Sequence, residues 1–544
     1  MSNGLRTLVL GFDALDSQYL ELFSDVTPTL SRLFSAGISA PLDSTVPPWT
    51  ASAWPSMYTG TDPSHHGVYG FFDYDYPDEG DLVTRNDVAA PALWNYLTEV
   101  SAPSVVLNVP VTHPAEPLEG VLVPGYLAGE DDAGYPRGVR EELSAALGEE
   151  YRVYSSGESS DDPATKLAGY LDLIDLRKRA AVELLSNRDW DLAIVQVQKT
   201  DAVFHNFDDE SAWRAVYEAA DDFAAAALDT VEEPCNVVVC SDHGMGRKQG
   251  YQIQLNDVLH RAGYLTATTD SETVSLGEAK QRKHSGADAD ASDGRSLVTA
   301  GATTAERLLS RVGLTPGRLY SVAETIGVED ILFDIVPNSV RQSVGKGVDW
   351  RESMAYCRSE SRLGVRINLA GREPAGVVSE AAYETVRGEL VSLLSELETP
   401  DGYPAFDSVL PREAVYEGPH VDAAPDIVLR PRNDDHVLST SLYGRPFLPA
   451  DVHDHDPTGV FAAYGPGFDH DATVDRLALP DVAPVVMAAL GHPVPQRMTG
   501  TVPSGLLEAP VERADYGEVP FGSDRTVADA RDDVTDALSD LGYI

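Results

Sequence analysis

The chain alternates short runs of apolar residues with longer amphipathic stretches. The apolar runs are four to seven residues long and rich in β-branched side chains, as is typical of strands buried on both faces; they include residues 7–12, 104–109, 192–198, 237–240 and 460–464. The amphipathic stretches have the spacing of helices, at residues 29–36, 91–100, 164–185 and 383–397. This alternation predicts the α/β class, with a mostly parallel central sheet and helices on both faces.

Two of the apolar runs end abruptly in residue types that bind metals. Residues 7–12 are followed by Asp13, and residues 237–240 are followed by Asp242 and His243. Ligands of open α/β sheets bind at the carboxyl ends of the strands, and carboxylate and imidazole donors suit zinc or manganese. A single Asp-His-Gly tripeptide is more often a polar turn, so a metal site requires donors from elsewhere in the chain.

Two further segments offer such donors. In TDAVFHNF, Asp201 and His205 lie four residues apart and so share one face of a helical turn. Thr50 follows Pro47 and Pro48 at the expected start of a helix, where free backbone N–H groups favour a phosphate. The simpler interpretations are that Thr50 is a helix N-cap and that Asp201 caps a helix bearing an unrelated surface histidine.

Length and polarity suggest an interrupted catalytic core. The 544 residues exceed one simple core, and the polar stretch from about residue 264 predicts an insertion, with helical pieces near 304–312 and 321–336 forming a cap. We therefore expect a catalytic core in two parts, an inserted cap and an acidic C-terminal tail with a terminal helix at 529–541; the boundaries are 1–263, 264–353, 354–510 and 511–544.

The net charge of the chain indicates which kinds of partner and which cellular compartment to expect. Asp and Glu number 87 against 40 Lys and Arg, a formal net charge of −47 that is spread along the whole sequence. This surface repels nucleic acid polymers and anionic membranes, and it is typical of a halophilic protein in a salt-rich cytoplasm. The three cysteines indicate reduced core residues, and no apolar run approaches the ~20 residues of a membrane span. We therefore expect a cytoplasmic protein.

Five motifs, taken together and in their order, resemble the alkaline phosphatase superfamily. They are FDALD, PPWTASAWPSMYTG, TDAVFHNF, SDHGMG and HDHDPTGVFAAYGPGF, and the resemblance covers residues 5–263 and 354–503. The chain is most similar to the type I phosphodiesterase and nucleotide pyrophosphatase family, in particular its cytoplasmic prokaryotic members. The resemblance implies an alkaline phosphatase-like fold.

The resemblance also implies a site with two divalent metal ions, Zn or Mn. Asp201, His205 and a late histidine would hold one ion, and Asp13, Asp242 and His243 the other. Thr50 would lie between the two ions, bound to metal, as the nucleophile. His455 is favoured over His453 as the late histidine, because the family's ligand lies four residues before the glycine that is Gly459 here.

These residues imply a hydrolase that cleaves phosphodiesters, or phosphomonoesters, through a phosphothreonine intermediate. The substrate would be a small-molecule or a glycan- or lipid-linked phosphate ester. A metal-dependent phosphomutase of the same superfamily is the alternative, and a non-catalytic binding protein is a third. The asparagine that often follows the His-Gly turn in nucleotide pyrophosphatases is missing from HHGVYGFFDY, which puts nucleotide specificity in question.

Overall fold

The computed structural model of the chain describes residues 5–76, 79–231, 234–268, 347–359 and 363–523. Its centre is an eight-stranded sheet with the order β21-β2-β20-β8-β1-β7-β5-β6. Every pairing in this sheet is parallel except those that β20 makes with β2 and β8. The strands in sheet order are Leu477–Ala478, Ile38–Asp43, Thr458–Tyr464, Cys235–Ser241, Arg6–Phe12, Leu192–Val197, Ser104–Leu107 and Gly120–Val123.

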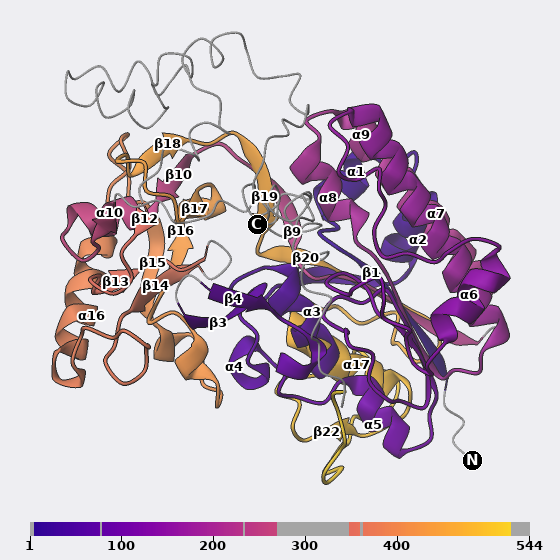
Figure 1. Ribbon diagram of the computed structural model, residues 1–544. Coiled ribbons are helices and arrows are strands. Elements are labelled where there is room, and N and C mark those ends of the chain that lie inside the picture. Colours follow the sequence, from indigo (N-terminus) through magenta and orange to yellow (C-terminus); the bar gives the residue numbers. More distant parts are fainter. Residues whose placement is uncertain (1–4, 77–78, 232–233, 269–346, 360–362, 524–544) are drawn as a thin grey trace, which may run out of the picture.

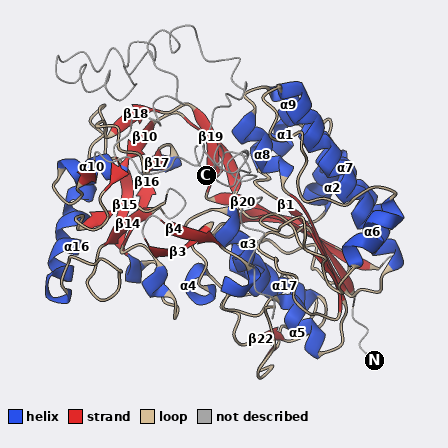
Figure 2. Ribbon diagram, viewed as in Figure 1, coloured by secondary structure: helices blue, strands red, loops and turns tan. Residues whose placement is uncertain are grey.

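Helices cover both faces of the sheet, as the sequence predicts (Figures 1 and 2). One face carries α1, α2, α6, α7, α8 and α9, with bounds Ser17–Leu22, Pro28–Ala36, Val139–Leu147, Pro163–Asn187, Lys199–Asn206 and Glu210–Asp229. The other carries α3, α5 and α17, with bounds Thr50–Thr59, Leu93–Glu99 and Val482–Ala489. This arrangement confirms the predicted fold class.

The hydrophobic core explains why the central strands contain hardly any polar residues. Every residue of β7 and β8 is buried, and so is all of β1 after Arg6. Parallel strands covered by helices on both faces have no solvent side, so continuous apolar runs replace the alternation of a half-exposed strand.

A second hydrophobic cluster forms between residues 253 and 442. It lies around the sheet β13-β14-β16-β15, which is covered by α16 (Glu380–Ser395), and beside the small sheet β17-β10-β18 (Figure 1). The bounds of β13, β14, β15 and β16 are Ala355–Tyr356, Gly364–Ile367, Phe406–Pro411 and Ile427–Pro431. Those of β10, β17, β18 and α10 are Tyr251–Gln254, Val437–Ser439, Phe447–Pro449 and Leu255–Arg261. Residues 354–510 thus contribute to both clusters, and the chain returns to the main core with β20.

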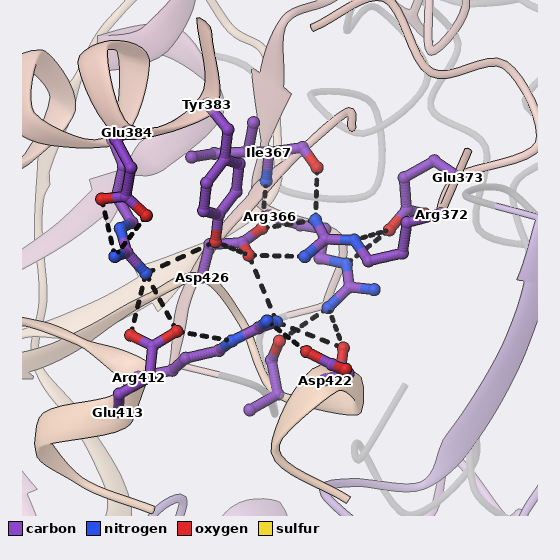
Figure 3. Close-up of polar contacts among 12 residues, drawn as sticks. Arg366, Ile367, Arg372, Glu373, Tyr383, Glu384, Arg412, Glu413, Asp422 and Asp426 are labelled. Carbon is purple, nitrogen blue, oxygen red and sulfur yellow. Dashed lines mark hydrogen bonds and ion pairs between the residues drawn. The ribbon is translucent and has the colours of Figure 1, made fainter. Parts of the chain in front are cut away.

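An ion-pair network joins the elements of this second unit, with Asp426 at its centre (Figure 3). The fully buried Asp426 carboxylate accepts hydrogen bonds of 2.6 and 2.7 Å from the Arg372 guanidinium and one of 2.6 Å from the Tyr383 hydroxyl. It also accepts the backbone N–H of Ile367 at 2.6 Å. The network therefore connects β14, α16 and the segment that leads into β16.

The second unit contacts the segment that leads into α3. Tyr416 Oη donates to the carbonyl of Val46 at 2.7 Å, and the backbone N–H of Gly418 donates to Ser64 Oγ of α4 (Pro63–His66) at 2.8 Å. A two-stranded ribbon of β9 (Gly244–Lys248) and β19 (Val452–Asp456) connects the two units (Figure 1). Both units therefore border the carboxyl edge of the central sheet.

The remaining strands form short pairs: β3 with β4, β11 with β12, and β22 with β23, with bounds Phe72–Tyr76, Glu79–Leu82, Ala267–Thr268, Gly347–Val348, Val494–Pro495 and Arg513–Ala514. The predicted helical pieces at 304–312, 321–336 and 529–541 lie outside the described residues. Within the described ranges, no helix has the length and apolar character that crossing a bilayer requires.

Candidate metal centre and active site

The ends of β1 and β8 bring three of the predicted residues together. The two strands are parallel neighbours in which Phe12 is paired with Ser241, so Asp13 and Asp242 leave the sheet side by side. His243 Nε2 lies 3.5 Å from Asp13 Oδ1 and 3.4 Å from Asp242 Oδ2. The backbone N–H of Ala14 donates to Asp242 Oδ1 at 3.2 Å, which orients that carboxylate toward the other two residues.

A second group comes from α8 and β19. Asp201 Oδ1 lies 3.2 Å from His205 Nε2, as their spacing on one helical turn predicts, and 3.5 Å from His455 Nε2. His455 also stacks on His243, with ring centroids 3.9 Å apart, and its Nδ1 lies 2.9 Å from the Pro48 carbonyl oxygen. His453 lies elsewhere, against the rings of Phe204 and Trp213.

Thr50 is the first residue of α3 and is fully buried. The N-cap of this helix is Trp49, so the Thr50 hydroxyl is not occupied as a cap. Instead, Thr50 Oγ1 donates to Asp13 Oδ1 at 3.2 Å. The seven residues predicted from the sequence thus lie together at the carboxyl edge of the sheet.

Four polar atoms of this cluster lack the hydrogen bonds that buried groups normally make. Both carboxylate oxygens of Asp201, Asp242 Oδ2 and His243 Nε2 are buried without a hydrogen-bond partner. Two sets of possible ligand atoms are present, and within each set the atoms lie within 4.8 Å of one another; one set comes from Asp13, Asp242 and His243 and the other from Asp201, His243 and His455. Carboxylate and imidazole donors arranged in this way fit a divalent metal ion.

Electrostatics also favour cations at this position. Burial and then the neighbouring Asp242 and Asp201 raise the pKa of Asp13 well above its usual value, and burial raises that of Asp242. Burial and the nearby His243 and His205 hold the pKa of His455 well below its usual value, so its ring is neutral at pH 7. Burial also lowers the pKa of His205, but the adjacent Asp201 outweighs it and raises that pKa overall. Bound cations would relieve the repulsion among the buried carboxylates.

Sequence patterns did not reveal the residues that orient Asp13. Its Oδ2 accepts hydrogen bonds from Gln196 Nε2 at 3.3 Å and from Trp54 Nε1 at 3.4 Å. The one available signal is Gln196 itself, because a polar side chain inside a strand buried on both faces needs an internal partner. Trp54 carries no such signal, since a tryptophan in an apolar helix is expected in any core.

A cavity of about 620 Å³ opens beside His455, between the main core and the second unit. From the core it is lined by residues 43–46, Pro48 and Trp49, and by the buried Lys248. The opposite wall is mostly apolar and includes Leu363, Val428, Leu429 and Leu438. This opposite wall therefore comes from residues 363–438 of the second unit. Residues 269–346 of the predicted cap lie outside the described residues.

The fold, the candidate metal ligands and the family match that follows define the class of protein: an enzyme with a mixed α/β fold that hydrolyses phosphate esters. The sequence model of the type I phosphodiesterase / nucleotide pyrophosphatase family matches residues 7–319, more than half of the chain, and the chain belongs to this family. Members of this family are metal-dependent. The family, fold and enzyme class expected from the sequence are thereby confirmed.

Solved structures support the same fold. Phosphonoacetate hydrolase from Sinorhizobium meliloti 1021, in complex with phosphonoformate, is similar with a TM-score of 0.54 and 17% sequence identity. The match covers 89% of this chain and 96% of that chain. The complex of the same hydrolase with phosphonoacetate gives a TM-score of 0.53 at 16% identity, with the same coverage. The search of curated proteins found no match.

Proposed function

We propose that this protein hydrolyses phosphodiesters through a covalent phosphothreonine at Thr50. The observation that carries the proposal is the position of Thr50 Oγ1, which is buried at the N-terminus of α3 and 3.2 Å from Asp13 Oδ1, at the edge where the other six residues gather. A hydroxyl there faces both a set of metal-binding side chains and the positive end of a helix dipole.

The proposed roles of the residues follow from their places in the cluster. Asp13, Asp242 and His243 would hold one divalent ion, Zn or Mn, and Asp201, His205 and His455 another. Such ions would supply positive charge that favours the ionised hydroxyl and stabilises charge on the phosphoryl and leaving oxygens. The hydrogen bond to Asp13 holds the Thr50 proton on the side of the carboxylate and leaves an oxygen lone pair for attack.

The reaction would proceed in two successive displacements at phosphorus. Thr50 Oγ1 forms a bond to phosphorus while the bond to the leaving oxygen breaks, and the leaving alcohol takes up a proton as the Thr50 proton is released to solvent. Water then attacks phosphorus, the bond to Oγ1 breaks, and the threonine hydroxyl is restored. The products are a phosphomonoester and an alcohol.

The cavity beside His455 suggests where the rest of the substrate lies. Its volume of about 620 Å³ is within the usual range for small-molecule sites, and its wall combines Trp49 and aliphatic side chains with Lys248. A small-molecule or a glycan- or lipid-linked phosphate ester would fit this mixture. The charge of −47 disfavours nucleic acid polymers as substrates, and it supports a halophilic, cytoplasmic setting.

Substitutions at Thr50 test the covalent mechanism. Thr50→Ala should retain metal binding but lose hydrolysis of a chromogenic phosphodiester by at least ~1,000-fold, an effect of ~4 kcal/mol. Thr50→Ser should keep a substantial part of the activity because it retains the attacking oxygen. Parent-level hydrolysis by Thr50→Ala would overturn the proposal, and transfer of phosphate to a second hydroxyl rather than to water would indicate a phosphomutase.

A further inference from the structure

A chain of buried amides crosses three neighbouring strands and ends on the Asp13 carboxylate. Asn108 follows β5, Gln196 lies in β7 and Asp13 follows β1, and these strands are adjacent and parallel. Asn108 Nδ2 donates to Gln196 Oε1 at 2.8 Å, and Gln196 Nε2 donates to Asp13 Oδ2 at 3.3 Å. All three residues are buried, so solvent does not compete for these hydrogen bonds.

The direction of these side-chain hydrogen bonds, from Asn108 through Gln196 to Asp13, is fixed at Asn108. Asn108 Nδ2 also donates to the backbone carbonyl of Gln196 at 3.1 Å, and a carbonyl oxygen can only accept. The Asn108 amide must therefore present its NH₂ group to Gln196. Gln196 Oε1 is then the acceptor, which leaves the Gln196 NH₂ group facing Asp13.

The backbone near Asn108 and Gln196 holds both side-chain amides in place. Asn108 has φ = 62°, a left-handed conformation that asparagine and aspartate tolerate better than most residues. A Cβ atom at Gly125 would lie 2.0 Å from the Asn108 carbonyl oxygen, so the main chain packs closely there. At Gly11, a Cβ would lie 2.5 Å from the Trp54 ring and 3.4 Å from Gln196 Cγ, so this glycine leaves room for both donors to Asp13.

We infer that Asn108 and Gln196 are positioning residues that hold the Asp13 carboxylate in the orientation in which one oxygen is hydrogen-bonded inside the sheet and the other faces the reaction site. Gln196 and Trp54 both donate to Asp13 Oδ2, whereas Oδ1 faces the Thr50 hydroxyl and His243 Nε2. Outer partners of this kind orient a metal ligand and tune its affinity. The inference rests on the proposed role of Asp13 as a metal ligand.

Asn108→Asp tests the direction of the chain of hydrogen bonds. The substitution preserves size and tolerates the left-handed backbone, but it replaces the donor to Gln196 with an acceptor. The Gln196 amide would then turn its NH₂ group toward the introduced carboxylate and its oxygen toward Asp13. Asn108→Ala removes the donor without adding an acceptor, so its effect should be smaller.

The matched control is Asn236→Asp, on strand β8, which lies on the other side of β1 from β7 and β5. Asn236 is equally buried, and its Nδ2 donates to the Ala489 carbonyl at 3.0 Å, away from the cluster. This variant loses one buried donor, as Asn108→Asp does, without contacting Asp13. It therefore measures what the loss of a buried amide donor costs in general.

The readout is Mn²⁺ binding to the full chain, measured by calorimetry without substrate, with circular dichroism to verify folding. Asn108→Asp should weaken one of two bound ions by ~10- to 100-fold, Asn108→Ala should weaken it less, and Asn236→Asp should match the parent. Parent-like binding in both Asn108 variants, or an equal loss in Asn236→Asp, would overturn the inference. A parent protein that binds no Mn²⁺ would overturn both the proposed function and this inference, whereas failure in the variants alone would overturn only the inference.

Discussion

Asp13 and Thr50, which are joined by a 3.2 Å hydrogen bond, lie at the point where the main features of this molecule meet. Asp13 directly follows β1, one of the two middle strands of the sheet, and Thr50 begins a helix that covers one face of that sheet. Asp13 also contacts His243, which follows the neighbouring strand β8. The hydrogen bond thus places the proposed nucleophile directly beside the buried candidate metal ligands.

The two histidines of β19 provide a matched pair for the metal centre. His455→Ala should lower the content of one metal ion and reduce turnover by more than ~100-fold, because His455 contacts Asp201 and stacks on His243. His453→Ala should keep the parent metal content, since His453 packs against Trp213 and Phe204. Elemental analysis of the two purified variants, with circular dichroism for folding, checks this prediction; normal metal content in His455→Ala would contradict it.

The Asp426 network predicts a pH-dependent contribution to stability. Burial alone would raise the pKa of Asp426, but hydrogen bonds and charge from Arg372, and the charge of Arg366, hold it below its usual value. A lowered folded-state pKa gives stability that is complete above the unfolded pKa of ~3.9 and is lost as the pH falls through the folded-state pKa. Asp426→Asn should therefore destabilise the protein at pH 7 by about 3 kcal/mol, and the difference should shrink below about pH 4.

Calorimetric unfolding at pH 7 and pH 3 measures this difference. Glu384→Gln is the control, because Glu384 pairs with Arg387 from a largely exposed position and should change the melting temperature little. A deficit in Asp426→Asn that is as large at pH 3 as at pH 7 would show that the carboxylate charge is not what stabilises this unit.

The charge of −47 predicts a strong dependence of stability on salt. Like charges on the surface repel one another, and the Debye length falls from ~10 Å at 0.1 M to ~3 Å at 1 M salt. The melting temperature should rise steadily from low salt to molar KCl, and dilution should cause loss of structure. Equal melting temperatures in low and molar salt would contradict the prediction that this is a halophilic protein.

Most of the central sheet and the donors at its strand ends could be predicted from the sequence. Asp13 and Asp242 follow runs of buried apolar residues, and the register of β1 and β8 places such strand ends side by side. The spacing of Asp201 and His205 likewise defines one face of a helical turn. These are local patterns, and local patterns are what a single sequence reveals.

The contacts that depend on distant parts of the chain were not predictable in this way. Asn108 meets Gln196 only because β5 pairs with β7, and His455 meets Asp201 only through the pairing of β19 with β9. The cavity wall from the second unit depends on the same long-range arrangement. For Thr50, the sequence left a helix cap as an alternative, whereas the structure has Trp49 as the N-cap and Thr50 bonded to Asp13.

The central claim is that Thr50 itself attacks phosphorus, and acid quench of a reacting sample tests it most directly. Protein loaded with Mn²⁺ is mixed with a chromogenic phosphodiester, quenched in acid within milliseconds and digested for peptide mass spectrometry. We expect the phosphoryl group, with its remaining ester substituent, on Thr50 in the parent and on the serine of Thr50→Ser, with none on the same peptide of Thr50→Ala. Rapid turnover by the parent with no phosphorylated Thr50 peptide at any quench time would contradict the covalent mechanism.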